Sequence, residues 1–316
     1  MVSKIKLLMR SLYDENDRFR VMSSFGIYDN MPDDEYIIKL FKAMMKKNLN
    51  LKDPQTFNEK LQWLKLYDRK PEYTTMVDKY AVKQYVADKI GEEYIIPTLG
   101  VWNHFDEIDF NKLPNQFVLK CTHDSGGLII CKDKSRLDLK AAKKKLERCL
   151  KRNFYYSGRE WPYKNVKPMI IAEKFMEDNE DVADLGLIDY KFFCFNGIPK
   201  FAYVARGAAK AFKSKINMMD LDWKAMPFQR TDHPQFKEIP EKPINFSKMI
   251  EFSKVLSKDI PFVRVDFYEI NSRLYFGELT FFPGSGYIPF NSEEWDYKLG
   301  EWIKLPKIAS GLKSKV

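Results

Sequence analysis

Apolar residues recur at helical spacing through the first 75 residues of the chain. Three stretches carry the pattern of amphipathic helices, at residues 36–44, 56–67 and 78–89. In the second of these, Thr56 can cap the helix, and Glu59, three residues later, completes a capping box. Gly91 ends the third helix, and residues 95–97 then read as a short strand. The pattern predicts a helical N-terminal region at residues 1–75.

Short apolar runs bounded by turn residues replace the helical pattern from Phe117 onward. The runs FVLK and LIIC flank the turn-rich sequence CTHDSGG, which predicts a hairpin. Later strands are expected in MIIAEKFM, YKFFCFNG, IPKFAYVAR, FVRVDFYEI and RLYFGELTF. Helices are expected at residues 137–150 and 246–258, and residues 153–168 read as an aromatic loop. Strands interspersed with a few helices predict α+β layers rather than a doubly wound parallel sheet.

The composition fits a globular protein with anionic partners. A chain of 316 residues, 45% of them hydrophobic, can bury the core of two domains or of one large domain with appended pieces. Its net charge of +9 favours nucleotides, acidic sugars, nucleic acid or an anionic membrane surface, without choosing among them. No run approaches the roughly 18 apolar residues of a membrane span, and the N-terminus turns charged too early for a signal peptide. We therefore expect a cytoplasmic protein.

Two carboxylates interrupt apolar strands near the C-terminal end of the chain. Asp266 lies in VRVDFYEI and Glu278 in RLYFGELTF, with a turn at Asn271-Ser272 between them. A charged side chain in such a run is costly to bury unless it is paired or binds a metal. Antiparallel pairing would bring both carboxylates within reach of one cation, and hard oxygen ligands suit Mg²⁺ on nucleotide phosphates. Alternatively, both residues point to solvent from an edge strand.

A lysine and a glycine pair flank the predicted hairpin turn. Lys120 ends the first strand, and Ser125, Gly126 and Gly127 follow it. Glycines allow close approach of the backbone to phosphate, and successive N–H groups can form an anion-binding nest. An ordinary hairpin turn explains the same residues. The spacing matches neither a P-loop nor a dinucleotide-binding motif.

Further charges are embedded in the predicted strands. Glu173 closes the run MIIAEKF, Lys191 begins another strand, and Arg206 ends AYVAR. Arg264 precedes Asp266 by two residues and so shares its face of the strand. Each of these alone could be a solvated charge at a sheet edge. Together they form a set of cations and carboxylates embedded in strands, which indicates a functional site more strongly than any one of them does.

The aromatic loop NFYYSGREWPY is a candidate for substrate binding. Tyr156, Trp161 and Tyr163 offer flat rings that can stack on a sugar, and the guanidinium of Arg159 can hold a uronic carboxylate bidentately. The alternative is a packed aromatic lid that binds no ligand.

The order and spacing of several segments resemble the TupA-like ATP-grasp proteins of bacterial polysaccharide biosynthesis. The resemblance runs from about Thr56 to Pro306. The segments that carry it are TFNEKLQWLKLYDR, VDKYAVKQYV, FVLKCTHDSGG, REWPY ahead of IIAEKFM, DYKFFCFNG and VRVDFYEINSRLYFGELTFFPGSGY. The resemblance implies an α+β ATP-grasp fold, in which two α+β subdomains sandwich the nucleotide behind the helical N-terminal extension. The first part would be residues 76–180 with the glycine loop, the second residues 181–309 with the metal carboxylates, and 310–316 a basic tail.

The same resemblance implies roles for the singled-out residues. Lys120 and Lys191 would contact phosphate, Gly126-Gly127 would cover it, and Glu173 would lie in the strand that recognises the base or ribose. Asp266 and Glu278 would hold the metal. The remaining implied positions are Lys79 and Lys83 at the start of the nucleotide-binding half, and Thr280 beside the metal. ATP-grasp enzymes commonly carry Asn at the position of Thr280, so this chain could bind one metal ion rather than two.

The activity that the resemblance implies is an ATP- and Mg²⁺-dependent carboxylate–amine ligase that acts through an acyl phosphate. The acceptor would be the carboxylate of an acidic sugar or glycan, and the second substrate an amino acid or another amine. Lys120, Lys191, Arg264 and Arg206 would neutralise charge on the transferred phosphoryl group.

Two other functions fit the composition. One is a glycosyltransferase that uses a nucleotide-sugar, and the other is a non-catalytic polyanion-binding protein. Specific nucleic-acid binding is not expected, because basic and aromatic residues are not interleaved. Basic residues near the N-terminus, such as Arg10, Arg18 and Arg20, could hold the inner face of a membrane, or could simply form a solvated helical face.

Overall fold

Two antiparallel sheets carry the fold in the computed structural model, which describes residues 8–179, 186–206 and 214–307. The first sheet has the order β1-β4-β2-β3 and consists of β1 (Thr98–Trp102), β2 (Phe117–Cys121), β3 (Leu128–Cys131) and β4 (Ile170–Lys174). The second has the order β7-β6-β5-β8-β9 and consists of β5 (Ile188–Phe195), β6 (Ile198–Arg206), β7 (Lys215–Asp220), β8 (Phe262–Ile270) and β9 (Arg273–Thr280). The expectation of α+β layers is confirmed.

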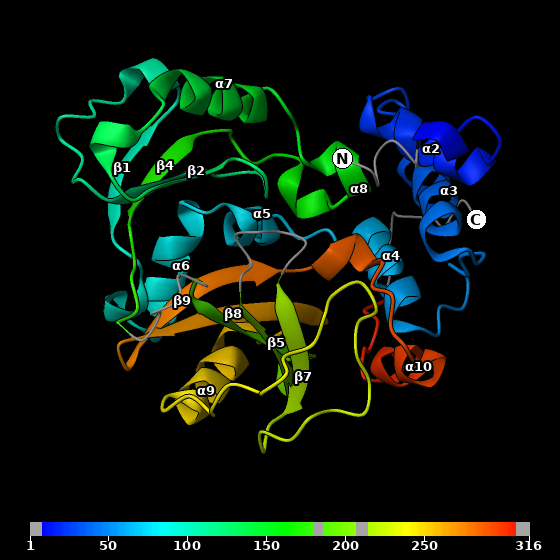
Figure 1. Cartoon of the computed structure of the whole chain (residues 1–316). Helices are drawn as coiled ribbons and strands as arrows, with labels where there is room; N and C mark the ends of the chain where they lie inside the picture. Colours follow the sequence, from blue (N-terminus) through cyan, green and yellow to red (C-terminus); the bar gives the residue numbers. More distant parts are fainter. Residues whose placement is uncertain (1–7, 180–185, 207–213, 308–316) are drawn as a thin grey trace.

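Helices cover the outer faces of both sheets and fill the space beside them. They are α2 (Glu15–Ser24), α3 (Asp33–Met45), α4 (Phe57–Tyr67), α5 (Glu72–Val77), α6 (Ala81–Ile90), α7 (Leu139–Leu150), α8 (Tyr155–Gly158), α9 (Phe246–Leu256) and α10 (Glu293–Glu301). Figure 1 shows α7 on the outer side of the first sheet, α9 beneath the second, and α5 and α6 between the levels of the two sheets. The inner faces of the sheets are therefore left to line a shared space.

The predicted helix boundaries hold where local chemistry sets them. Thr56 Oγ1 accepts a hydrogen bond from the Glu59 N–H at 3.2 Å, and Glu59 Oε2 accepts one from the Thr56 N–H at 3.0 Å, so the capping box is confirmed. Gly91 ends α6 at a φ of 114°. The strand expected at residues 95–97 is wrong, because β1 begins only at Thr98. Pro97 has no N–H to donate to a ladder and contributes only its carbonyl.

The β8–β9 hairpin is set by its turn. Asn271 and Ser272 have φ values of 50° and 62°, the left-handed pair that a tight type I′ connection requires. This register places Asp266 directly opposite Glu278, with a bulge immediately after Asp266. The predicted pairing of the two carboxylates is therefore confirmed.

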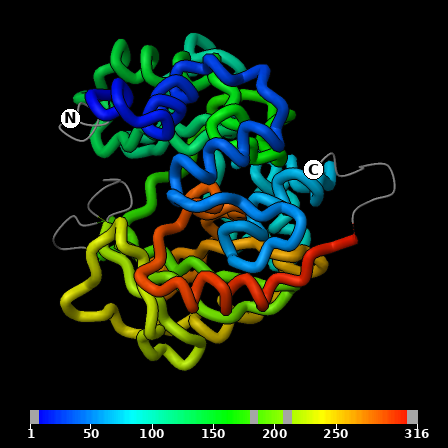
Figure 2. Tube along the Cα trace, turned by 90° about the vertical axis from the view of Figure 1, so that its right-hand side faces the viewer, coloured from blue at the N-terminus to red at the C-terminus, as the bar shows by residue number. Residues whose placement is uncertain are grey.

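The N-terminal helices cover one side of the molecule. Figure 2, which turns that side toward the viewer, shows α2 and α3 stacked above α4. Phe19 of α2 and Tyr36 of α3 pack with Tyr287, so the extension shares a core with the chain that follows β9. Two of the basic residues near the N-terminus, Arg10 and Arg20, form ion pairs with the buried Asp17.

The predicted domain limits fall unevenly on these elements. The limit at residue 75 lies inside α5. The limit at residue 180 lies outside the described residues, with the first sheet before it and the second after it. The predicted tail at 310–316 also lies outside them. Within the described ranges, every helix is too short or too polar to cross a bilayer.

Candidate active site

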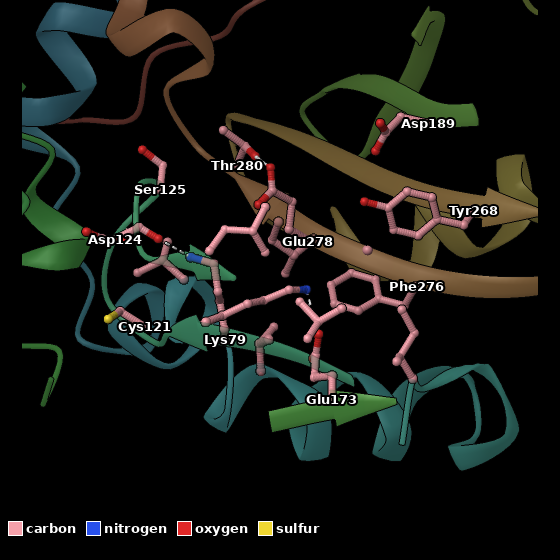
Figure 3. Close-up of a pocket in the computed structure, with 18 of the residues that line it drawn as sticks. Lys79, Cys121, Asp124, Ser125, Glu173, Asp189, Tyr268, Phe276, Glu278 and Thr280 are labelled. Carbon is pink, nitrogen blue, oxygen red and sulfur yellow. Dashed lines mark hydrogen bonds and ion pairs between the residues drawn. The ribbon is translucent and has the colours of Figure 1, made fainter. Parts of the chain in front are cut away.

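A cavity of about 1000 Å³ lies between the two sheets. The first sheet contributes β2, β4 and the loop after β2, and the second contributes residues of β5, β8 and β9. Figure 3 shows Glu173 entering from the first sheet and Glu278 and Thr280 entering from β9 on the opposite side. Its volume is at the upper end of the range for small-molecule sites. The cavity therefore has room for a ligand of nucleotide size.

Lysines and one glutamate form the charged floor of the cavity on the first sheet. Val118 pairs with Glu173 across β2 and β4, so Lys120, two residues after Val118, lies on the same face. The Glu173 carboxylate forms ion pairs with Lys120 at 2.5 Å and with Lys83 of α6 at 2.6 Å. Burial alone would raise the pKa of Glu173, but these two lysines outweigh it and lower the pKa. Two cations against one carboxylate leave an excess positive charge toward the cavity.

The glycine loop is held by a residue that sequence reasoning missed. The Asp124 Oδ1 atom accepts hydrogen bonds from the N–H groups of Gly126 at 2.9 Å and Gly127 at 2.8 Å. Lys79 donates from Nζ to the Asp124 carbonyl at 2.5 Å, an interaction visible in Figure 3. Ser125 and Gly127 line the cavity. The amides expected to form an anion nest are thus already bonded to a carboxylate, and a phosphate would have to replace it.

Lys191 and its partners form a buried ionic network on the second sheet. Lys191 donates from Nζ to Asp189 Oδ1 at 3.0 Å and to Asp266 Oδ2 at 2.6 Å. Burial alone would lower the pKa of Lys191, but Asp189 and Asp266 outweigh it and raise the pKa well above its usual value. The lysine is therefore charged at neutral pH, and it lines the cavity as predicted for a phosphate contact.

Arg264 gathers the three residues predicted to hold the metal. Its Nη2 atom lies 2.6 Å from Asp266 Oδ2, 2.9 Å from Glu278 Oε1 and 3.0 Å from Thr280 Oγ1. Of these residues, Glu278 and Thr280 line the cavity, while Asp266 is 1% exposed. Three oxygens that converge on one cationic nitrogen are a donor set that also suits a hard metal ion. The residues therefore fit Mg²⁺, with the guanidinium standing in its place.

The metal candidates do not form a closed cage. Among the described residues, no group of three carboxylate, imidazole or thiolate side chains gathers around one point. Asp266 and Glu278 with the hydroxyl of Thr280 would leave coordination positions for phosphate oxygens and water, as Mg²⁺ sites on nucleotides require. Arg264, Lys191 and Lys79 outweigh the effect of burial and lower the pKa of Glu278 to about 2, so its carboxylate is charged at any physiological pH.

Arg159 requires a correction. Its side chain is fully buried, and its Nη2 atom donates to the carbonyls of Tyr28, Asp29 and Met31 at 2.8 to 3.2 Å. Its guanidinium also stacks 4.3 Å from the ring centroid of Tyr36. A uronic carboxylate cannot reach the Arg159 guanidinium in this arrangement, so the expected contact is wrong. The aromatic loop instead docks onto the N-terminal helices.

Most of the other predicted substrate and catalytic residues lie outside the cavity lining. Tyr163 lines it, whereas Tyr156 packs against Tyr155 and Trp161 forms the start of a short helical turn. Arg206 donates from Nε to the carbonyl of Gly186, a residue at the cavity edge. Of these four predicted residues, only Tyr163 lines the cavity.

Sequence reasoning also missed the apolar wall of the cavity and two of its polar ends. The apolar residues come from both sheets and from the segment after β4: Val118, Ile130, Phe175, Met176, Phe276 and Leu279. Asp189 and Tyr268 form one polar end, where the Asp189 carboxylate raises the pKa of Tyr268. Glu160 and Ser285 form another. Only Asp189 had a signal, because it lies two residues before Lys191 and so on its face of the strand.

Replacing Lys120 with methionine is expected to raise the KM for ATP about 10- to 100-fold. A charge-assisted hydrogen bond to phosphate contributes about 1.5–3 kcal/mol, and Lys83 remains to neutralise Glu173. The measurement is phosphate release as a function of ATP concentration. Lys254→Met, an exposed lysine on α9, is the matched control and is expected to leave the KM unchanged. An unchanged KM in Lys120→Met would remove this residue from the phosphate site.

Several solved structures are similar to this chain. D-Alanine-D-Alanine ligase from Helicobacter pylori is 16% identical, with 78% of this chain and 69% of that chain covered at a TM-score of 0.39. ATP-grasp ligase PsnB, solved with a phosphomimetic precursor variant, Mg and ADP, is 10% identical at a TM-score of 0.37. That alignment covers 71% of this chain and 57% of the PsnB chain, less than two thirds.

D-alanyl-alanine synthetase A from Vibrio cholerae is also similar to the chain. It is 11% identical, with 72% of this chain and 59% of that chain covered at a TM-score of 0.38. No curated protein matches the chain by sequence. A family model described as TupA-like ATPgrasp matches residues 59–304, well over half of the chain. With its two antiparallel sheets facing a shared cavity, the chain belongs to the TupA-like ATP-grasp family.

Proposed function

We propose that the chain is an ATP- and Mg²⁺-dependent ligase that joins a carboxylate to an amine through an acyl phosphate. One observation carries the proposal: oxygens of Asp266, Glu278 and Thr280 converge on a single cationic position beside the cavity. The opposite wall presents Lys120 of the first sheet and Lys83 of α6. This arrangement suits a polyphosphate chain with its metal ion. The lysines are complementary to the phosphates, and the carboxylates are complementary to the metal ion.

The apolar wall defined above is the proposed binding surface for the base. It contains Phe175, Met176 and Phe276, and flat apolar surfaces of this kind favour a purine ring over a phosphate. Glu173 then acts through its two ion pairs, which hold Lys83 and Lys120 toward the phosphates. This assignment places the base and the phosphates at different ends of one cavity.

The charged residues of the second sheet are proposed to act on the transferred phosphoryl group. Mg²⁺ held by Asp266, Glu278 and Thr280 would supply positive charge to the phosphoryl oxygens. Lys191, charged and oriented by two aspartates, neutralises further charge there. Arg264 would then be released from the same three oxygens and could bind the phosphoryl group in turn. Arg206 is the weakest member of this proposed set, because it does not line the cavity and its side chain donates to the backbone carbonyl of Gly186.

The acceptor is proposed to be an acidic sugar or glycan in cell-surface polysaccharide biosynthesis, and the nucleophile an amino acid or another amine. The proposed sugar rests on the resemblance to the TupA-like ATP-grasp proteins of bacterial polysaccharide biosynthesis. An acyl phosphate requires no protein nucleophile, which agrees with the lack of any Ser-His-Asp arrangement near the cavity in the described part of the chain.

A thermal-shift titration tests the nucleotide assignment. We expect a non-hydrolysable ATP analogue with Mg²⁺ to stabilise the protein, by about 2.7 kcal/mol at a hundred times its Kd. UDP-glucose, whose sugar carries no carboxylate, is expected to give no comparable shift without ATP. Stabilisation by the nucleotide-sugar but not by the ATP analogue would instead favour a glycosyltransferase. Steeply salt-dependent binding of single-stranded nucleic acid, without any ATP effect, would favour a polyanion-binding protein.

A further inference from the structure

Glu160 stands out among the buried acidic residues that line the cavity in the described part of the chain, because its carboxylate makes no direct ion pair and accepts no backbone N–H bond, whereas that of Asp124 accepts two. Glu173, Asp189 and Glu278 each have a lysine or arginine within 3.0 Å. Glu160 also lines the cavity and is only 6% exposed, yet within the described ranges no lysine or arginine nitrogen lies within 4 Å of its carboxylate. Burying a carboxylate without a direct partner is costly, and the nearest opposing charge, on Lys65, is held by other acceptors. The position therefore suits a ligand that brings its own positive charge.

A network of polar contacts fixes Glu160 in place. Its carboxylate accepts a hydrogen bond from the hydroxyl of Ser285, which follows the end of β9. The Lys65 Nζ of α4 donates to Ser285 Oγ at 3.1 Å, to the Ser285 carbonyl at 2.8 Å and to the Gly158 carbonyl at 2.8 Å. Lys65 also donates to Gln62 Oε1 at 2.9 Å, so its hydrogen bonds go to acceptors other than Glu160, and only its charge acts on the Glu160 carboxylate.

Packing leaves this network little freedom. A Cβ on Gly158 would lie 2.1 Å from Ser285 Oγ, so the two segments meet as closely as their backbones allow. The following residue, Arg159, is anchored to the N-terminal helices and has a φ of 55°. The backbone before Glu160 is therefore held on both sides, and its side chain is presented to the cavity from a rigid support.

The position of Glu160 is next to the proposed phosphoryl-transfer end. Ser285 lies five residues after Thr280 on the same stretch of chain, and both line the cavity. Tyr163 lines it as well, and burial together with the carboxylates of Glu160 and Glu278 raises the pKa of its phenol. Tyr163 thus lies within electrostatic reach of both carboxylates. A ligand beside Glu160 would therefore lie near the end of the cavity where the phosphates are proposed to bind.

We propose that Glu160 binds the amine substrate as its ammonium ion and accepts the proton that the nitrogen must lose before it attacks. This inference rests on the ligase function proposed above and assigns a residue to its second substrate. Burial raises the pKa of Glu160 above that of an ordinary glutamate, although Lys65 and Ser285 oppose the shift, and a raised pKa suits a base.

The proton and bond changes balance without a further reactant. The ammonium nitrogen gives one proton to the Glu160 carboxylate, which leaves a neutral amine with a lone pair. That lone pair forms the C–N bond at the acyl carbon, and the C–O bond to phosphate breaks with its electrons on the phosphate. The nitrogen then loses its second proton to the departing phosphate or to water. Glu160 returns its proton to solvent when the cavity opens.

Glu160→Gln tests the inference, because it removes the charge and keeps an oxygen for Ser285. The substrates are identified first. Hexuronic acids and amino acids are tested in pairs, and the pair that supports phosphate release by the unaltered protein is chosen. With that pair, we expect Glu160→Gln to lower kcat/KM for the amino acid about 100-fold, in line with the loss of a general base. With hydroxylamine in place of the amino acid, we expect hydroxamate to form at the unaltered rate, because hydroxylamine is mostly uncharged at neutral pH.

Two further variants complete the test. Glu160→Asp, which keeps the charge, is expected to restore part of the activity with the amino acid, and Glu294→Gln, an exposed glutamate on α10, is expected to keep all of it. An equal loss with amino acid and hydroxylamine, or no loss with either, would overturn the role of Glu160 while leaving the ligase function intact. If none of the tested pairs of carboxylate and amine supports phosphate release by the unaltered protein, the proposed ligase function is wrong. The role of Glu160 is then wrong as well.

Discussion

Glu278→Gln is expected to lower Mg²⁺-dependent ATP turnover about 100- to 1000-fold while the protein stays folded. Removal of one electrostatic contact to a reacting group costs about this much in well-studied enzymes. Glu278 combines a carboxylate that lines the cavity with a pKa of about 2, so a full negative charge is available to a metal ion at neutral pH. Glutamine has the same shape but is a weaker ligand for Mg²⁺.

The measurement is the rate of phosphate release at saturating ATP, with the Mg²⁺ concentration varied. Because a weakened metal site fills at higher metal concentration, part of the loss should be recovered by added Mg²⁺. Glu241→Gln changes the same chemical group on an exposed loop and is expected to leave the rate unchanged. A Glu278→Gln protein that turns over ATP normally would exclude this residue as a metal ligand.

Asp266→Asn is expected to lower the free energy of unfolding by about 3–5 kcal/mol, the cost of breaking a buried ion pair from one side. Asp266 is 1% exposed and accepts two hydrogen bonds from Arg264, at 2.7 and 2.6 Å, and one from Lys191 at 2.6 Å. Without its charge, both cations remain buried with less compensation. The measurement is urea denaturation in the absence of Mg²⁺ and nucleotide, so that binding does not contribute.

Asp222→Asn is the control for this experiment, since Asp222 is exposed in the turn after β7. We expect its unfolding free energy to differ by less than about 0.5 kcal/mol from that of the unaltered protein. A loss below about 1 kcal/mol in Asp266→Asn would mean that water or a rearranged Arg264 compensates the missing charge. The ionic network could then rearrange easily. The convergence of three oxygens on Arg264 Nη2 would no longer support a metal position there.

The parts of the site that sequence could predict are those governed by local rules. The pairing of Asp266 with Glu278 follows from a two-residue turn and the alternation of side chains along β8 and β9. The capping box at Thr56 and the hairpin around Lys120 likewise depend on neighbours a few residues away. In each case the interacting groups are close in sequence, so their types and spacing carry the information.

The parts that sequence could not predict depend on contacts between distant segments. Arg159 looked like a ligand-binding arginine in an aromatic loop, but its partners lie about 130 residues earlier in the chain. Glu160 gave no signal, because its lack of a cation becomes visible only when α4 and the chain after β9 are in place. The missed helix α10 has few apolar residues, and Leu299 and Gly300 are buried against parts of the fold that its own pattern does not reveal.

The backbone carbonyls that bind Arg159 bear on where the folded unit of this protein begins. The stretch shared with the family begins at residue 59, whereas the carbonyls that hold Arg159 belong to residues 28–31. The segment that the family shares is therefore shorter than the segment that packs together in this protein. A truncated protein that starts at the shared stretch would keep Glu160 but lose the anchor of the residue before it. Variation in the N-terminal helices could therefore retune substrate choice without altering any residue that touches the substrate.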